Sequence, residues 1–187
     1  AAFAATVPIS VIRPPIVFGQ GDTATLRMIR PIARWGIHLV PSWFNHRFSA
    51  VHAQDLSAAM IAAADRGKRI SSAGDSSSAG VYFVAGGEDP FYADLGRKMA
   101  QALGRKRLWV LRSGPLLTWG TATAFELLAR LQGQPLVMSW DKAREATAGS
   151  WSCSDERARN ELDYAPAATL DERLAETVAW YRDHRWL

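Results

Sequence analysis

The order of apolar and polar residues divides the chain into short strands and helices. Residues 7–12 are almost continuously apolar and β-branched, which is typical of a strand buried on both faces. Pro14 and Pro15 follow, and because proline has no backbone N–H to donate, we expect strand pairing to end there. A glycine-rich turn at 19–22 leads into a predicted helix at 23–35, whose internal proline should kink or break it.

The same alternation continues toward the C-terminus. Short apolar runs predict strands near residues 38–41, 48–52, 81–85 and 108–111. Apolar residues at helical spacing predict helices at 54–65, 90–104, 115–131, 141–147 and 154–162, and a final helix that opens at 169–172. Strands and helices therefore alternate along the chain, which predicts an α/β fold.

Side-chain patterns indicate how some of these helices begin and which faces they bury. Asp89 precedes a proline and should be an N-cap, and Thr169 and Glu172 have the spacing of a capping box. Leu56, Met60 and Ala63 have the spacing of a helix at 54–65. In the final helix one face should point inward: Leu170, Leu174, Val178 and Tyr181.

The first strand needs more neighbours than the rest of the sequence offers. A strand that is buried on both faces requires partners along both of its edges, or its backbone groups stay unpaired. Few later segments could flank residues 7–12 in this way. We therefore expect this strand to belong to a larger sheet than the 187 residues supply.

Composition and charge exclude several classes of protein. The chain has 22 basic and 18 acidic residues, a net charge of +4, with one dense basic cluster at 105–107. This indicates a solvated surface rather than a nucleic-acid-binding protein, which needs several phosphate contacts on one face. Cys153 is the only cysteine, so the chain can form neither an intramolecular disulfide nor a cysteine-based metal site. A single cysteine fits a reducing compartment, and we expect a cytoplasmic protein.

The N-terminus and the hydropathy pattern carry no targeting signal. Residues 1–8 lack a basic region and are too short for the apolar core of a signal peptide. No run reaches the roughly 18 apolar residues that a membrane span needs. The opening five residues are instead typical of the last turn of a helix that began earlier.

Four segments, in order, resemble one enzyme family. Residues 11–22 resemble the "LRPxxVYGPGD" segment of extended short-chain dehydrogenases/reductases, and residues 48–56 resemble their "FSFVHVDDLA" segment. Residues 81–88 resemble their "YNLAGGE" strand, which precedes a helix ending in "ALGR", as at 102–105. Residues 154–162, with the Trp-Tyr helix that follows, resemble their C-terminal segment. The chain is thus similar to the C-terminal part of an NAD-dependent epimerase/dehydratase.

The resemblance implies a fold and a division of the chain. Residues 1–36 would be the last part of a truncated Rossmann-type, doubly wound nucleotide-binding domain. Residues 37–187 would be mostly a small mixed α/β substrate-binding region, with returning Rossmann elements. Residues 107–151 resemble a narrower group, the bacterial relatives of 3β-hydroxysteroid dehydrogenases and dihydroflavonol reductases.

The catalytic parts that the family implies are missing from the sequence. Members hold the cofactor pyrophosphate on a glycine-rich turn and move a proton with a Tyr-x-x-x-Lys pair, while the nicotinamide moves the hydride. The sequence contains neither motif. In the family both lie before the segment with which this chain begins, so we expect a fragment that is inactive by itself. The intact enzyme would use NAD or NADP on a sugar nucleotide or on a steroid-like or flavonoid-like hydroxy or keto compound.

What remains would contribute binding residues. In the family the residues after the first strand line the nicotinamide side of the cofactor, and by motif position these are Pro14, Pro15, Ile16 and Val17. Backbone groups that the prolines free from strand pairing could meet the carboxamide. The simpler alternative is a proline pair that only ends a strand.

Arg47 and His52 are the candidate substrate-binding residues. An arginine near this place grips substrate phosphates in nucleotide-sugar members. Here it precedes His52 by five residues, where about four are expected, and a surface arginine is the alternative. His52 is more often a core histidine, and Asp55 would cap or tune its helix. Five tryptophans could wall an apolar cavity or pack in the core: Trp35, Trp43, Trp109, Trp119 and Trp140.

Two other functions compete with the enzyme fragment. The chain could be a noncatalytic substrate-binding module that docks on a separate nucleotide-binding chain. The apolar helix at 115–131 could also contact a membrane surface weakly. The intact enzyme could be a homodimer.

Overall fold

The computed structural model describes most of the chain in two compact units. The described residues are 7–40, 45–70, 78–114, 119–120, 123–124, 144 and 149–187. Unit 1 comprises residues 1–27, 48–89 and 152–187, and unit 2 comprises residues 28–47 and 90–151. The helices predicted at 115–131 and 141–147 lie almost wholly outside the described residues.

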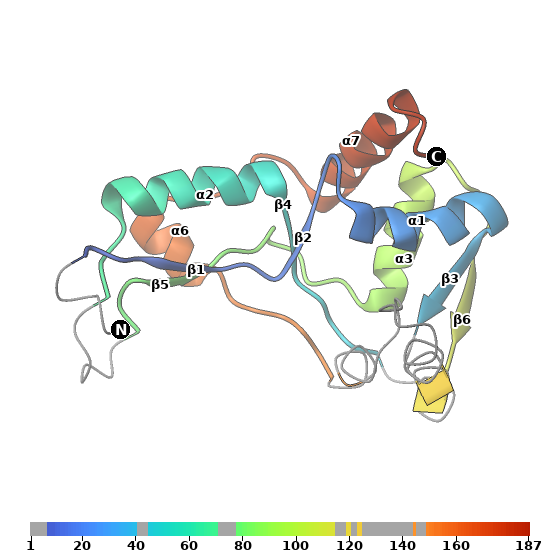
Figure 1. Cartoon of the computed structure of the whole chain (residues 1–187), viewed down its shortest axis with the longest axis horizontal. Helices are drawn as coiled ribbons and strands as arrows, with labels where there is room; N and C mark the ends of the chain where they lie inside the picture. The colour runs from blue at the N-terminus through green and yellow to red at the C-terminus, as the bar shows by residue number, and fades with distance from the viewer. Residues whose placement is uncertain are drawn as a thin grey trace. The chain divides into compact units, whose positions relative to one another are not determined.

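Unit 1 contains two parallel strand pairs (Figure 1). Strand β1 (Val11–Arg13) pairs with β5 (Val81–Phe83), and strand β2 (Ile16–Phe18) pairs with β4 (Ala50–His52). The turn at Gly19 then leads into the first helix. Among the described residues, every strand pair is two-stranded and parallel. The α/β prediction is confirmed.

Helices α2 (Ala53–Arg66) and α6 (Glu156–Leu162) lie side by side in Figure 1. Helix α6 packs against β5, and α2 packs against β2 and β4. Apart from Asp55, the buried positions of α2 are alanines, whose small side chains let α6 approach closely. The core here includes the following buried residues: Val51, Ala59, Ala63, Tyr82, Val84, Ala158, Leu162 and Tyr164. Apolar burial of this extent is the main stabilising contribution in unit 1.

Helix α7 (Leu170–Asp183) begins as the sequence predicts. The Thr169 hydroxyl accepts from the Glu172 amide, and the Glu172 carboxylate accepts from the Thr169 amide, so the capping box is confirmed. The predicted inward face is also confirmed, since its four residues are buried: Leu170, Leu174, Val178 and Tyr181.

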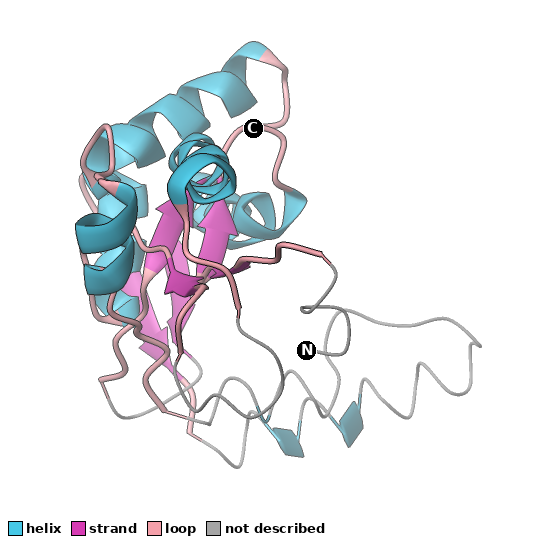
Figure 2. Ribbon diagram, turned by 90° about the vertical axis from the view of Figure 1, so that its left-hand side faces the viewer, coloured by secondary structure: helices cyan, strands magenta, loops and turns pink. Residues whose placement is uncertain are grey.

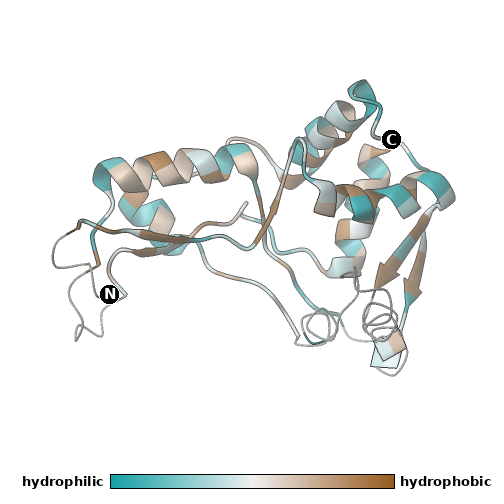
Figure 3. Cartoon of the chain, in the orientation of Figure 1, coloured by the Kyte–Doolittle hydropathy of each residue, from teal (hydrophilic) through white to brown (hydrophobic). Residues whose placement is uncertain are grey.

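Unit 2 holds a third parallel pair. Helix α1 (Thr23–Trp35) begins in unit 1 and continues into unit 2, where strand β3 (Ile37–Val40) pairs with β6 (Trp109–Arg112). Helix α3 (Tyr92–Ala102) packs against β3. Figure 2 shows all of these helices and strands by type, and Figure 3 colours much of β3 and β6 as hydrophobic.

One face of the β3–β6 pair is uncovered in the described part of unit 2. Side chains alternate along a strand, so the register places Ile37 beside Trp109 and Leu39 beside Leu111 on one face. Leu39 is 61% exposed and Trp109 is 69% exposed. His38 and Val40, on the opposite face, are buried. We call the first set the apolar face of unit 2.

Some local features differ from the predictions. The pairing of β1 with β5 ends before Pro14, as predicted, but a strand that the sequence did not predict, β2, begins directly after Pro15 and pairs with β4. Helix α1 runs through Pro31 as one helix, so the expected break is wrong, whereas a kink there stays a prediction. Of the residues whose spacing predicted α2, Ala63 is buried but Met60 is 54% exposed, and the other buried positions of this helix are Asp55 and Ala59.

The N-cap prediction for Asp89 is also wrong. Helix α3 starts at Tyr92, and its N-cap is Phe91, which makes no side-chain cap. Asp89 instead accepts a hydrogen bond of 2.6 Å from the Ser49 hydroxyl. The Asp89 carboxylate therefore binds a residue distant in sequence instead of capping the helix.

Strand β1 is only partly enclosed by the described residues. Val7 is half exposed, and Val11 and Ile12 are only partly buried. Among the described residues β1 pairs as a strand with β5 alone. The expected burial on both faces is therefore not reached among the described residues, and one edge of the strand also lacks a strand partner there.

Candidate functional site

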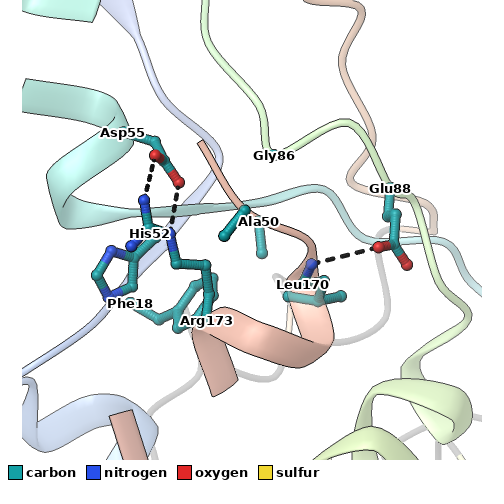
Figure 4. Close-up of a pocket in the computed structure, with 9 residues that line it drawn as sticks. Phe18, Ala50, His52, Asp55, Gly86, Glu88, Leu170 and Arg173 are labelled. Atoms are coloured by element: carbon teal, nitrogen blue, oxygen red, sulfur yellow. Dashed lines mark hydrogen bonds and ion pairs between the residues drawn. The ribbon is translucent and has the colours of Figure 1, made fainter. Parts of the chain in front are cut away.

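The most connected polar group in unit 1 is a buried ion pair between α2 and α7. Arg173 donates to both carboxylate oxygens of Asp55, from Nη2 at 2.6 Å and from Nε at 3.1 Å (Figure 4). Asp55 also accepts from the Ala167 amide at 3.1 Å, and Arg173 Nη1 donates to Gln54 at 2.9 Å. Asp55 and Arg173 are both buried. This two-pronged geometry and the extra hydrogen bonds offset the cost of removing two charges from water.

His52 lies beside this pair, at the end of β4. Its Nδ1 accepts from the Gln54 amide at 3.3 Å and caps α2. The neutral ring therefore carries its proton on Nε2, which is buried and has no partner among the described residues. Burial lowers the pKa of His52, and the nearby Arg173 charge lowers it further. His52 is thus neutral at physiological pH.

The ring of His52 also shapes the end of β2. It meets the Phe18 ring edge to face, with 5.4 Å between the centroids. A Cβ at position 19 would lie 3.1 Å from His52 Nε2, so the close approach requires Gly19. The candidate residue His52 is therefore a buried packing and capping residue, as its core interpretation expects; substrate contact by it stays a prediction.

A small cavity lies among these residues. Its volume is about 10 Å³, and Figure 4 shows side chains from β2, β4, α2 and α7 around it. Its lining residues include Phe18, Ala50, His52, Glu88 and Arg173. This volume holds about one water molecule, so the cavity is too small for a cofactor or a substrate.

The candidate cofactor residues lie at the surface of unit 1. Pro14 is exposed, Pro15 is half-buried, and Ile16 and Val17 are each more than one-third exposed. Prolines 14 and 15 fall between β1 and β2, outside both strand pairs. The segment is therefore accessible to a ligand, although it forms no closed pocket by itself.

A larger polar cleft of about 440 Å³ opens elsewhere in unit 1. Its lining residues are Ala85, Gly87, Asp89, Ser152, Cys153, Ser154 and Asp155. Asp155 is bound at both oxygens by Arg159, and burial raises the pKa of the Cys153 thiol. The thiol is therefore a poor nucleophile at neutral pH. No group of residues within the described ranges is suited to hold a metal ion.

Arg47 belongs to unit 2, whereas His52 belongs to unit 1. The Arg47 side chain is exposed, and its guanidinium lies 4.4 Å from the centroid of the Phe91 ring. Its backbone carbonyl accepts from the Trp151 amide at 2.8 Å. The guanidinium is thus stacked on an aromatic ring, where it is positioned but still accessible.

The tryptophans that the sequence offered for the core or for a cavity wall are mostly exposed where the structure describes them. Trp35, Trp109 and Trp119 are all exposed, so core packing is wrong for these three. Trp43 and Trp140 lie outside the described residues. In the parts of the chain that are described, no helix has the length and apolar character needed to cross a membrane.

Sequence reasoning missed Arg173 and the hydroxyl of Tyr181. Arg173 has a detectable signal, because it falls on the inward face of α7 between Leu170 and Leu174. A cation on a buried helical face requires a partner. Its partner, Asp55, is 118 residues away in sequence and cannot be identified from spacing.

Comparisons with known proteins find similarity in structure but not in sequence. No protein-family model matches the chain, and no curated protein matches its sequence. UDP-glucose 4-epimerase from Thermotoga maritima, solved with UDP-glucose, matches with a TM-score of 0.64 and 14% identity, over 98% of this chain and 50% of its own.

Two further solved structures match over a similar extent. The dTDP-glucose 4,6-dehydratase of Bacillus anthracis, in complex with NAD, has a TM-score of 0.62 and 16% identity, over 98% of this chain and 48% of its own. RMD from Pseudomonas aeruginosa, complexed with NADPH, has a TM-score of 0.63 and 15% identity, over 98% of this chain and 52% of its own. The chain thus has the fold of about half of each of these structures, which confirms the Rossmann-related fold class.

Proposed function

We propose that this chain is the C-terminal part of an NAD(P)-dependent extended short-chain dehydrogenase/reductase of the epimerase/dehydratase type. The observation that supports this most directly is the pairing of β1. Among the described residues this apolar parallel strand has a partner on one edge only. Parallel sheets are stable when they are extended and covered on both faces. A nucleotide-binding half that supplies the next strand would satisfy the second edge.

The matched share of the solved structures agrees with this proposal. The chain spans about half the length of each of them, while nearly all of the chain is matched. The sequence has no glycine-rich cofactor turn and no Tyr-x-x-x-Lys pair. The proposal assigns both to polypeptide outside these 187 residues.

In the intact enzyme, Pro14, Pro15, Ile16 and Val17 would line the nicotinamide side of the cofactor. These residues are at least partly exposed, and the two prolines lie outside the strand pairs. A flat ring could therefore lie against this segment. Solved relatives of the same fold contain NAD or NADPH, so either cofactor suits the proposal. When bound, the nicotinamide would supply hydride transfer, and this segment would orient it.

The substrate would bind mainly through unit 2. The apolar face of unit 2 favours a hydroxy or keto compound with an apolar ring system, because an exposed face of Trp109, Leu39 and Leu111 gains from apolar contact. A sugar nucleotide, which one matched epimerase binds, would instead use the accessible guanidinium of Arg47. The apolar face makes the first substrate class our preferred one. We also propose a cytoplasmic location, because a single cysteine fits a reducing compartment.

The test is expression of the full-length protein from the coding sequence that includes the region upstream of Ala1. We expect an in-frame glycine-rich turn and a Tyr-x-x-x-Lys pair, and NAD(P)-dependent turnover with a panel of apolar alcohols, ketones and sugar nucleotides. A start codon with a ribosome-binding site at Ala1 would contradict the proposal and favour a noncatalytic module. Turnover that is lost on Arg47→Ala would favour the sugar nucleotide.

A further inference from the structure

We propose that Tyr181 is a positioning residue that holds the turn at residues 19–22, and with it the cofactor segment at 14–17. The inference rests on the proposed function, in which residues 14–17, just before the turn, line the cofactor. Tyr181 lies in α7, about 160 residues along the chain from the turn that it contacts. It would touch neither cofactor nor substrate, and would act only through the backbone of the turn.

The hydroxyl of Tyr181 is inserted into the turn. It donates to the backbone carbonyl of Asp22 at 2.6 Å, and the Gly19 carbonyl lies 3.3 Å away. The side chain is fully buried, and burial raises the pKa of Tyr181 to about 12. The hydroxyl therefore keeps its proton at any physiological pH and remains a donor.

The carbonyl that Tyr181 binds is the one that starts helix α1. It also accepts from the Leu26 amide at 3.3 Å, the first helical hydrogen bond, while the Asp22 carboxylate accepts from the amides of Ala24 and Thr25 at 2.9 Å. The Asp22 amide in turn donates to the Gly19 carbonyl at 3.2 Å. One tyrosine hydroxyl thus fixes both the turn and the first residue of the helix behind it.

The turn needs an external anchor because its own sequence is permissive. Gly19 and Gly21 both have positive φ angles, of 153° and 78°. Glycine allows this backbone but loses more conformational freedom on folding than any other residue. A buried hydrogen bond from a packed helix restricts these residues without requiring bulk at either glycine.

Helix α7 itself is anchored at a second point. Arg173, two helical turns before Tyr181, is bound to Asp55 at the start of α2. His52, which caps α2, packs against Phe18 at the end of β2. Residues 16–22 are therefore held by α7 directly through Tyr181 and indirectly through the Asp55 end of α2.

Two matched substitutions test the role in binding. In the full-length protein, Tyr181→Phe removes the hydroxyl in the turn, and Tyr164→Phe removes an equivalent one. Tyr164 is also buried, its pKa is also raised to about 12, and its hydroxyl donates to the Ala85 carbonyl at 2.8 Å. We expect Tyr181→Phe to weaken NAD(P) binding about five- to ten-fold with kcat unchanged, and Tyr164→Phe to change it less than about two-fold.

Amide hydrogen exchange on the 187-residue chain gives a readout that does not depend on activity. Exchange at Asp22 and Leu26 should become several-fold faster in Tyr181→Phe and stay unchanged in Tyr164→Phe. Equal effects of the two variants on cofactor affinity would reduce Tyr181 to a general stabilising residue and overturn the inference. Unchanged exchange at the turn would also overturn it.

Failure of the proposed function would look different. If the wild-type full-length protein does not bind NAD(P), the proposed function is wrong, and so is the cofactor part of this inference. The exchange experiment would then still decide whether Tyr181 holds the turn.

Discussion

At the residue scale, the Asp55–Arg173 pair shows why a buried charge must be explained by its partner. Arg173 occupies a position on α7 where the helical spacing calls for an apolar residue. It is tolerated because Asp55 and Gln54 accept its hydrogen bonds in the same buried space. Removing one partner would leave a desolvated charge, which costs far more than the loss of an exposed pair.

We expect Arg173→Leu to lower the free energy of unfolding by about 3–5 kcal/mol, because it leaves the Asp55 carboxylate buried without its cation. Urea unfolding measures the change. Lys68→Met is the matched control: Lys68 pairs with Glu161 at 2.9 Å but is 63% exposed. It should cost less than about 1 kcal/mol. Similar losses for the two variants would contradict the argument.

The buried histidines predict a pH dependence of stability. Burial lowers the pKa of both His38 and His52 below the ordinary value of 6.5. Below pH 6.5 the unfolded chain therefore binds protons that the folded chain does not, and stability falls with falling pH until the folded pKa is reached. We expect a loss of up to about 1.4 kcal/mol per pH unit for each histidine in this window.

Urea unfolding between pH 7.5 and pH 5 measures this loss, and substitution of the histidines identifies its source. The double variant His38→Gln, His52→Asn keeps a donor toward the Tyr92 carbonyl and an N-cap acceptor for α2. It should retain little pH dependence in this range. A slope equal to that of the wild type would show that other groups cause it.

At the element scale, the contact between α3 and β3 depends on the absence of one side chain. Gly96 lies in α3 directly against the ring of His38, and a Cβ at this position would overlap with that ring. His38 is buried, and its Nε2 lies 3.0 Å from the Tyr92 carbonyl at the start of the same helix. The ring is thus held both by a hydrogen bond and by the space that glycine leaves.

We expect Gly96→Ala to destabilise unit 2 by about 1–3 kcal/mol, although alanine is the better helix former by about 1 kcal/mol. The overlap with a buried ring outweighs the gain in helix propensity, and thermal unfolding measures the net effect. Gln101→Ala, at an exposed position of the same helix, should change stability by less than about 0.5 kcal/mol. A stabilised Gly96→Ala variant would show that His38 can move aside.

At the scale of the whole molecule, the chain consists of two units whose sequences are interleaved. The polypeptide passes from unit 1 to unit 2 within α1 and returns after Arg47, and it passes between them again after Asp89 and Trp151. Each unit is built on parallel strands that have a single partner among the described residues.

The proposed function predicts that the isolated 187-residue chain binds NAD(P) only weakly and does not reduce it. The reason is that the cofactor pyrophosphate needs a glycine-rich turn at a helix N-terminus, and this sequence has none. Isothermal titration calorimetry measures the affinity. Micromolar binding by the isolated chain would contradict the prediction.

The sequence by itself determined the elements whose signals are local. Apolar periodicity and hydrogen bonding within a few residues predict helices α1 and α7 and the capping box at Thr169. Short apolar runs likewise predict the strands other than β2. The motif order also indicated the fold that the solved structures share. Such features are determined by neighbours in sequence, so spacing alone reveals them.

Only the tertiary structure decided which distant groups meet. The partner of Asp55, the use of Asp89 by Ser49, and the contact of Tyr181 with the turn at 19–22 each join residues tens to more than a hundred positions apart. The exposure of Trp35 and Trp109 likewise depends on which elements cover them. These outcomes depend on packing between segments that are distant in sequence. The spacing of residues within one segment does not reveal which residue of another segment will satisfy a buried polar group.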